Sequence, residues 1–328
     1  RQSRAALGGA MTGRGLMLGM CRDEDIAPQS LFTGIGHAPA ALSAQELAAG
    51  MPPDAVAALD LPEWIVPAWD EALGGIAAPV AMAMRERAPV WLRVNTLRAS
   101  PAQAASVLAA EQIATDPHPD LPTALRVRDG ARRLAASAAY RDGLVELQDL
   151  SPQLACSLLP AQGSLLDYCA GGGGKALALA ARGLAPVTAH DIDAGRMSDL
   201  PARAARAGAR IAIAAPGQVS GRFDLVVADV PCSGSGTWRR TPDAKWRLTS
   251  ADLARLVQLQ ARILDQTAAL VAPGGALAYM TCSLLRAENQ SQTDAFLLRH
   301  PGFQQQEQRL FTPLDASDGF YLCLLRRR

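Results

Sequence analysis

Short apolar runs alternate with longer amphipathic segments over residues 150–328. The runs hold apolar residues at consecutive positions, which is typical of strands buried on both faces of a parallel sheet. One intervening segment, SADLARLVQLQARILDQTAALV, has the spacing of an amphipathic helix. This alternation predicts an α/β fold with a doubly wound, mostly parallel sheet. The predicted strands are SLLDYCA (164–170), APVTAHDI (185–192), ARIAIAA (209–215), FDLVVADV (223–230), GALAYMTC (275–282) and the closing GFYLCLLR.

Residues 1–78 have a weak periodicity and are rich in Ala, Gly and Pro. They predict a short helical region, with helices around ALSAQELAAGM and PPDAVAALDLPEWIVPAWDEAL. Ser43 followed by Glu46 is a capping-box signal, and Pro52 with Pro53 favours a helix start before DAVAALD.

Residues 79–148 show a different pattern, with helix PVAMAMRERA, strand VWLRVNTL, helix PAQAASVLAAE and short strands ending near GLVELQD. The segment DPHPDLP (116–122) predicts a loop among them. We therefore expect a small α/β domain at 79–148, between the N-terminal helical region and a third domain at 149–328.

Composition narrows the class of protein. The chain has 328 residues, 49% of them apolar and 19% charged, and none of its apolar runs has the length of a membrane-spanning helix. The six cysteines are spread widely, without a CxxC pair, so we expect a reducing cytoplasm, no membrane and no metal. The chain begins with Arg1 instead of Met, which predicts trimming at its front. A net charge of +1 does not discriminate between partners, because nucleic-acid binding depends on where positive charge is placed.

Lysine is nearly eliminated from this chain. Only two of the 32 basic residues are lysine and the rest are arginine, a bias that we attribute to base composition. The survivors, Lys175 and Lys245, each lie within a motif, which favours a specific role because lysine and arginine differ in geometry and hydration.

The segment LLDYCAGGGGKALALAA predicts a strand, a glycine-rich turn and a helix, a combination that brings backbone N–H groups close to a ligand. A tight turn without a ligand is the alternative. The P-loop pattern fails because Ala176 stands where a Mg²⁺-binding hydroxyl is needed, which argues against a kinase or ATPase. After the next strand, Asp191 is the candidate for binding ribose hydroxyls, and Asp193 is the candidate N-cap of the following helix.

The segment FDLVVADVPCSGSGTWRRTPDAKW runs from a buried strand into Asp229 and Cys232. Cys282 follows a second predicted strand, and the two strands are expected to be neighbours. Either cysteine alone would be read as a core residue, but two at the carboxyl ends of adjacent strands favour chemistry. A thiolate that adds to C6 of cytosine makes C5 nucleophilic toward the methyl group of a sulfonium donor, and a second thiolate or nearby base can take the C5 proton. Asp229 is placed to act at N3.

The arginines and tryptophans after Cys232 suit phosphates and stacked bases, although a solvated loop with packed tryptophans is the alternative. The expected RNA-binding residues are Arg93, Arg239, Arg240, Lys245 and Trp246.

These motifs resemble the Sun-type, RsmB-like family of RNA cytosine-5 methyltransferases. The resemblance is carried by VWLRVNTLR, DYCAGGGGK, DVPCSGSGTWRRTPDAKW and YMTCSLLRAEN and covers most of the chain. It implies a Rossmann-like methyltransferase domain with a seven-stranded sheet, S-adenosyl-L-methionine as cofactor, an RNA-binding small domain and an RNA substrate, with rRNA favoured over tRNA. It also implies that Cys282 is the nucleophile and Cys232 assists release. The implied cofactor-binding residues are Cys169, Ala170, Gly171, Gly172, Gly173, Gly174, Lys175, Asp191 and Asp229.

The chain departs from the family pattern at two places. The family turn usually reads CAAPGGKT, whereas Gly171 and Gly172 replace its Ala and Pro here. Near Gly217 the family usually carries an acid that faces the adenine amino group, and Gln218 is the candidate substitute. The region before the small domain is also shorter than the family's helical RNA-binding domain. An RNA-binding or ribosome-assembly factor without catalysis is therefore the alternative, and a DNA cytosine methyltransferase fits less well. We expect a monomer.

Overall fold

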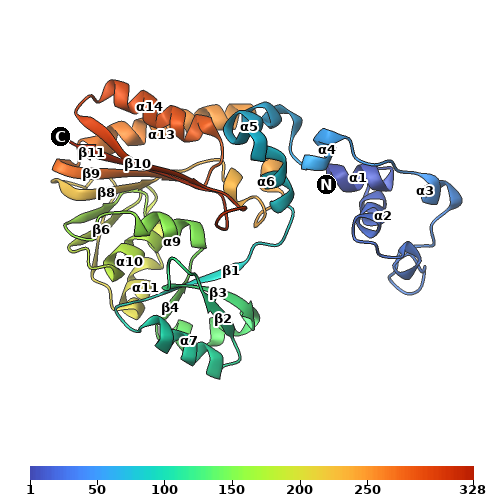
Figure 1. Ribbon diagram of the computed structural model, residues 1–328, viewed down its shortest axis with the longest axis horizontal. Coiled ribbons are helices and arrows are strands. Elements are labelled where there is room, and N and C mark those ends of the chain that lie inside the picture. The colour runs from blue at the N-terminus through green and yellow to red at the C-terminus, as the bar shows by residue number, and fades with distance from the viewer. The chain divides into compact units, whose positions relative to one another are not determined.

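The computed structural model describes residues 1–328, which form two compact units. The first unit holds Arg1–Glu86 together with Lys245–Arg247, and the second holds Arg87–Ala244 and Leu248–Arg328 (Figure 1). The small sheet and the large sheet, predicted as separate domains, both lie in the second unit. None of the helices is both long and apolar enough to cross a membrane.

The first unit is helical, as predicted. The predicted capping box is present, because Ser43 and Glu46 exchange side-chain to backbone hydrogen bonds at the start of α3. The helix expected after Pro53 is α4, which begins at Ala55, and the carboxylate of Asp54 caps its N-terminus. The helices are α1 (Gln2–Gly8), α2 (Gly13–Asp23), α3 (Ala44–Ala48), α4 (Ala55–Leu59), α5 (Val66–Leu73), α6 (Ala77–Ala83) and α12 (Ala244–Arg247), with 3-10 turns η1 (Pro28–Ser30), η2 (Glu63–Ile65) and η3 (Gly74–Ile76).

Helices α1 and α2 were not predicted, and their glycines explain why. A Cβ on Gly19 would lie 1.8 Å from the backbone oxygen of Arg4, and one on Gly8 would lie 1.8 Å from that of Gly15. These glycines let the two backbones approach closely, although glycine lowers helix propensity and in sequence is typical of a loop.

The small domain contains a four-stranded antiparallel sheet in the order β2-β3-β1-β4. The prediction of a loop from residue 116 was wrong in its first part, because β2 continues to Pro117, which lies opposite Leu125. Proline is tolerated there because β2 is an edge strand. The strands are β1 (Val90–Val94), β2 (Ala114–Pro117), β3 (Ala124–Asp129) and β4 (Val145–Leu147), and the helices are α7 (Pro101–Ala110), η4 (Ala131–Ala136) and α8 (Ala138–Arg141).

The large sheet has seven strands in the order β10-β11-β9-β8-β5-β6-β7. Strands β7, β6, β5, β8 and β9 are parallel, and β11 runs antiparallel to both of its neighbours. The strands are β5 (Leu165–Asp167), β6 (Val187–His190), β7 (Ile211–Ala214), β8 (Phe223–Asp229), β9 (Val271–Thr281), β10 (Phe303–Phe311) and β11 (Phe320–Arg327). The predicted doubly wound, mostly parallel sheet is confirmed.

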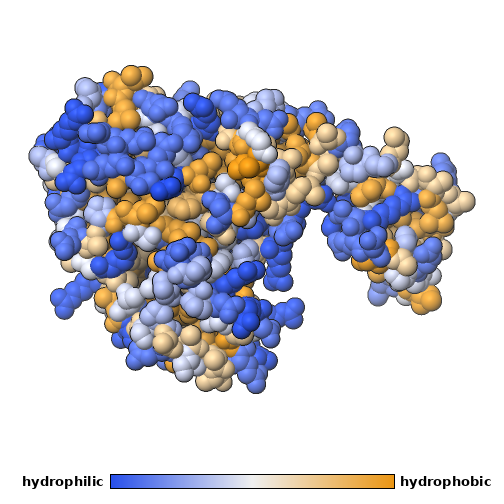
Figure 2. Space-filling view, viewed as in Figure 1, coloured by the Kyte–Doolittle hydropathy of each residue, from blue (hydrophilic) through white to orange (hydrophobic).

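Both faces of this sheet are covered. Leu165 and Val227 pack into one core cluster, whereas their chain neighbours Leu166 and Val226 pack into the cluster on the other face. Figure 1 shows the helices on both sides, and Figure 2 shows a mainly hydrophilic surface over α13 and α14. The helices are α9 (Leu150–Ser157), α10 (Gly174–Ala181), α11 (Leu200–Ala207), α13 (Ser250–Ala268) and α14 (Gln290–Arg299), with η5 (Ala194–Met197), η6 (Ser235–Thr237) and η7 (Arg286–Glu288).

Candidate active site

The site lies at the carboxyl ends of the central parallel strands. Asp167 ends β5, Asp191 follows β6 and Asp229 ends β8. Cys282 comes directly after β9, which is the neighbour of β8, as predicted. In open α/β sheets this edge is where ligands bind, because the loops that leave the strands form a crevice there.

The two cysteines come together. The sulfurs of Cys232 and Cys282 lie 3.3 Å apart, and both thiols are free and half-buried. The hydrogen bond with Cys282 and the burial of the thiol raise the pKa of Cys232 well above its ordinary value. Cys232 therefore keeps its proton at neutral pH.

Lys175, in the first turn of α10, forms an ion pair with Asp229. Burial acts to lower the pKa of Lys175, but the charge of the Asp229 carboxylate outweighs that effect and leaves the pKa above its ordinary value. Lys175 also lies over the ring of Phe320. The surviving lysine of the glycine-rich motif thus provides a fixed positive charge beside the cysteine loop.

The glycine-rich turn adopts backbone conformations that favour glycine, with φ of +50° at Gly171 and +78° at Gly173. Side chains from outside hold it: Arg93 donates to the carbonyl of Gly174 (2.8 Å), and Arg203 donates to that of Gly172.

The two aspartates after β6 have separate partners. One oxygen of Asp191 accepts from the N–H of Gly171 (3.0 Å) and also pairs with Arg196 (3.3 Å). Its other oxygen accepts from the N–H of Asp193 (3.0 Å). Asp193 caps η5, as predicted, because its carboxylate accepts from the N–H of Gly195.

Asp167 was not predicted as part of the site. One carboxylate oxygen accepts from the N–H of Ala176 (3.0 Å), whereas the other is buried and has no protein partner. Burial raises the pKa of Asp167 to about 7. Buried polar atoms are nearly always paired, so the free oxygen indicates a place for a donor from a ligand or water. The signal in the sequence was an acid at the end of a strand, just before the glycine-rich turn.

Glu288 was also missed. It is completely buried, and it accepts hydrogen bonds from the residues that follow each cysteine, Ser233 and Ser283. Its place six residues after Cys282 in TCSLLRAEN was the available signal.

The predicted RNA-binding residues are mostly engaged within the protein. Arg93 is buried and bonds Gln148 as well as the glycine-rich turn, and burial lowers its pKa to about 10. Arg239 pairs with Asp318 (2.7 Å). Arg240 is partly exposed and pairs with Asp318 and Asp149.

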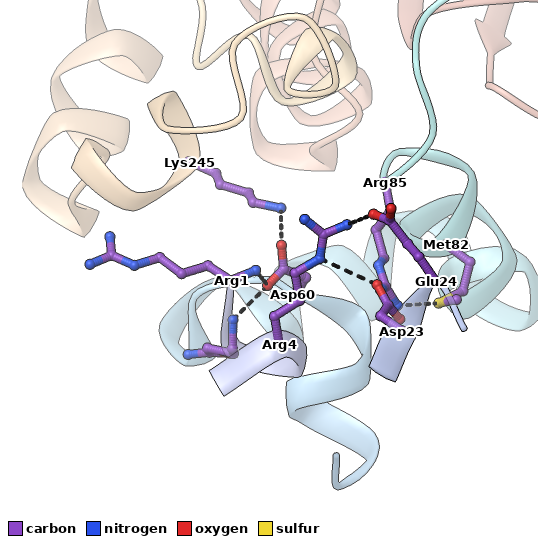
Figure 3. A network of polar contacts seen from close by, with 9 residues as sticks. Arg1, Arg4, Asp23, Glu24, Asp60, Met82, Arg85 and Lys245 are labelled. Atoms are coloured by element: carbon purple, nitrogen blue, oxygen red, sulfur yellow. Dashed lines mark hydrogen bonds and ion pairs between the residues drawn. The ribbon is translucent and has the colours of Figure 1, made fainter. Parts of the chain in front are cut away.

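Lys245 belongs to the first unit, where its ammonium group donates to Asp60 (3.1 Å) and both side chains are buried (Figure 3). The same ammonium group lies 5.6 Å from the ring centroid of Trp246, which is half-buried.

The remaining predicted cofactor positions are Cys169 and Ala170, and both are half-buried. Burial raises the pKa of the Cys169 thiol, which makes it a poor nucleophile. Gly217 has φ of +73°, and a Cβ there would meet no atom within 4 Å, so the position expected to carry an acid borders open space. No group of three or more His, Cys, Asp or Glu side chains is arranged to hold a metal ion.

The order and directions of the strands define the Rossmann-like methyltransferase fold. Two solved structures share it. A methyltransferase homologue protein from Pyrococcus horikoshii is 22% identical, with a TM-score of 0.71 over 82% of this chain and 96% of that chain. NSun6 from the same organism, solved with SFG, is 17% identical, with a TM-score of 0.73 over 81% of this chain and 98% of that chain. Residues 155–325 match the model of the 16S rRNA methyltransferase RsmB/F family, and residues 61–132 match the RsmF/B-like ferredoxin-like domain. The chain belongs to the RsmB/F family.

Curated relatives carry the name ribosomal RNA small subunit methyltransferase B. The one from Klebsiella pneumoniae is 35% identical over 287 residues, which are 81% of this chain and 66% of that protein. One from Salmonella newport is 37% identical over 250 residues, which are 73% of this chain and 58% of that protein. The chain thus spans about two thirds or less of the length of these relatives.

Proposed function

We propose that this protein transfers a methyl group from S-adenosyl-L-methionine to C5 of a cytosine in RNA, with 16S rRNA as the substrate. The observation that carries the proposal is the pair of free thiols 3.3 Å apart at the ends of two adjacent strands. A cytosine-5 transfer needs a nucleophile and a second group for release, and the pair supplies both. The names of the RsmB/F family and of the Klebsiella relative support rRNA over tRNA.

In this proposal Cys282 is the nucleophile. Its thiolate attacks C6 of the target cytosine, an S–C6 bond forms, and the electrons of the C5–C6 double bond become available at C5. The cofactor, when bound, supplies an electrophilic methyl group to that carbon. The ammonium group of Lys175, held in place by its ion pair with Asp229, stabilises the negative charge that develops on the ring near N3.

Cys232 assists release. Because its pKa is raised, it begins the reaction as a thiol hydrogen-bonded to Cys282. In the release step it takes the C5 proton and gives its own proton to the departing sulfur of Cys282. The C5–H and S–C6 bonds break, the C5–C6 double bond returns, and both cysteines end as thiols.

The side chains and backbone at the carboxyl ends of β5 and β6 fit the cofactor. S-adenosyl-L-methionine carries an ammonium group, for which the unpartnered oxygen of Asp167 offers a buried acceptor. The turn from Cys169 to Lys175 offers backbone N–H groups at the start of α10, and Asp191 offers carboxylate oxygens for the ribose. The structure of NSun6 with SFG, an analogue of this cofactor, supports the same use of the fold.

We assign RNA binding to the small α/β domain at 79–148 and to the loop after Cys232, with Arg240 and Trp246 as its more accessible predicted residues. Arg93, Arg239 and Lys245 would have to act while held in the contacts described above. We place the protein in the cytoplasm as a monomer, with no metal.

The test is methyl transfer in vitro to 16S rRNA, followed by nucleoside mass spectrometry for 5-methylcytosine. The wild-type protein is expected to produce it, and Cys282→Ala is expected to produce none. Bisulfite sequencing of cellular RNA with and without the gene then identifies the nucleotide. Full activity of Cys282→Ala would overturn the assignment of the nucleophile.

A second candidate is an RNA-binding or ribosome-assembly factor of the same fold that does not catalyse transfer. Gly217 favours it, because an adenine amino group would find no carboxylate there, a loss of about 0.5–1.5 kcal/mol of binding. Titration calorimetry with S-adenosyl-L-methionine separates the two candidates. The absence of detectable binding at millimolar cofactor favours the assembly factor, and binding with a micromolar dissociation constant favours the enzyme.

A further inference from the structure

Glu288 joins the two loops that carry the cysteines. One carboxylate oxygen accepts from the backbone N–H of Ser233 (2.8 Å) and from the amide of Gln260 (2.9 Å). The other accepts from the hydroxyls of Ser233 and Ser283. Ser233 follows Cys232 and Ser283 follows Cys282, so one side chain is bonded to the residue after each thiol.

Burial of the Glu288 carboxylate at this position has a cost in folding free energy. Glu288 has 0% exposure, and a buried carboxylate costs several kcal/mol unless hydrogen bonds compensate. All four of its donors are neutral, and hydrogen bonds to a charged acceptor are about twice as strong as neutral ones. A residue needed only for packing could be apolar, so the charge indicates that the alignment of these donors matters.

The surrounding contacts strengthen the same connection. The hydroxyl of Ser235 lies 2.9 Å from that of Ser283 and accepts from the N–H of Leu284 (2.8 Å). Asn289 donates to the carbonyl of Ser283 (2.9 Å). The tip of the second cysteine loop is thereby bonded to the first on several atoms, with Glu288 as the group that contacts both.

We propose that Glu288 is a positioning residue that sets the separation of the Cys232 and Cys282 sulfurs. This inference rests on the proposed function, in which that separation governs attack and release. The carboxylate of Glu288 hydrogen-bonds to neither sulfur and acts through the serine that follows each cysteine. Its loss is expected to lower kcat and to leave the KM values for RNA and cofactor nearly unchanged, because it supports reacting groups and not the binding surfaces.

The kinetic test compares Glu288→Ala with Glu288→Gln. Alanine removes all four hydrogen bonds, and because a misplacement of about 1 Å can cost a factor of about 100, a kcat loss of that order is expected. The glutamine oxygen can still accept from the Ser233 N–H while the serine hydroxyls turn to accept from its amide, so Glu288→Gln is expected to lose only about 10-fold. Equal losses in both variants, with one limb of the pH profile abolished, would indicate a proton acceptor and overturn the positioning role.

Asp265→Asn is the matched control. Asp265 lies on α13 and bonds Arg299 and His300 at the end of α14, and it has no contact with the cysteine loops. The Asp265→Asn variant carries the same acid-to-amide change on a helix that flanks the site, and its kcat is expected to equal that of the wild type. Circular dichroism and thermal unfolding check each variant. Should Glu288→Ala fail to fold, Ser283→Ala takes its place, because it removes the hydrogen bond of Glu288 to the second loop together with the contact between the Ser283 and Ser235 hydroxyls.

A second readout does not depend on methyl transfer. Diamide takes two hydrogens from a pair of thiols and joins their sulfurs, so the rate at which Cys232 and Cys282 form a disulfide reports their proximity. The wild-type pair is expected to oxidise quickly, and Glu288→Ala at least about 10-fold more slowly, as followed by peptide mass mapping. Equal rates would overturn the inference. A slower rate in the variant, with no methylation by the wild type, would support the role of Glu288 and reject the proposed function.

Discussion

Asp167→Asn tests the electrostatics at the end of β5. In the folded protein burial raises the pKa of Asp167 from 3.8 to about 7, a difference of about 3 units. At about 1.36 kcal/mol per unit, the buried charge costs about 4 kcal/mol above pH 7. The folded state binds a proton at Asp167 more tightly than the unfolded state, so the contribution of Asp167 to stability is greatest at and below about pH 4 and falls as pH rises toward 7. Asparagine does not ionise and removes this loss.

The expected result is that the two proteins are nearly equally stable near pH 4, and that Asp167→Asn is more stable by up to about 4 kcal/mol at pH 8. The hydrogen bond to the Ala176 N–H is kept by the asparagine oxygen. Urea unfolding, followed by the fluorescence of the five tryptophans, measures both proteins across this pH range.

Asp265→Asn is the control of opposite sign. Burial acts to raise the pKa of Asp265, but hydrogen bonds from His300 and Arg299 leave it lowered, so its replacement should destabilise the protein at neutral pH and have no effect in acid. Parallel pH profiles for the wild type and Asp167→Asn would refute the reasoning. The same carboxylate should bind the cofactor's ammonium group only when charged, so cofactor affinity should rise between pH 6 and 8 in the wild type and stay flat in the variant.

Two further substitutions separate roles that the sequence alone did not. Arg93→Met is expected to weaken cofactor binding measured by calorimetry, because Arg93 supports the glycine-rich turn, and a change in RNA affinity alone would contradict this. Lys245→Met leaves the buried Asp60 carboxylate with the Arg1 amino group as its remaining cation, and is expected to lower stability by about 1–3 kcal/mol, below the full cost of an unpaired buried charge. Thermal unfolding measures the loss, Asp60→Asn in the same chain should restore part of it, and an unchanged midpoint would show that the pair is not stabilising.

The parts of the fold that the sequence predicted are those where burial leaves a local pattern. Strands covered on both faces hold apolar residues at several consecutive positions, so β5, β8 and β9 were found together with the adjacency of Cys232 and Cys282. The strand β10 was missed because it lies at the edge of the sheet and is polar, reading FQQQEQRLF. Helices α1 and α2 were missed because their glycines serve close packing between helices.

The parts of the site that were missed depend on contacts between distant segments. Glu288 lies 55 residues from Ser233, and nothing local in the sequence shows that a buried carboxylate will bond that loop. Arg93 was interpreted as an RNA contact because arginine suits phosphate, but its partner Gly174 is 81 residues away in the chain. Motif identity therefore located the reactive residues, whereas the residues that hold them in place required the three-dimensional contacts.

The central claim is that Cys282 attacks the cytosine and Cys232 releases it. The most direct measurement is denaturing gel electrophoresis of Cys232→Ala after reaction with 16S rRNA and S-adenosyl-L-methionine. The account predicts a protein–RNA adduct that survives denaturation, carries its RNA on Cys282 by peptide mapping, and is absent in the Cys232→Ala, Cys282→Ala double variant. An adduct that persists in the double variant, or a Cys232→Ala protein that turns over at the wild-type rate without an adduct, would contradict it.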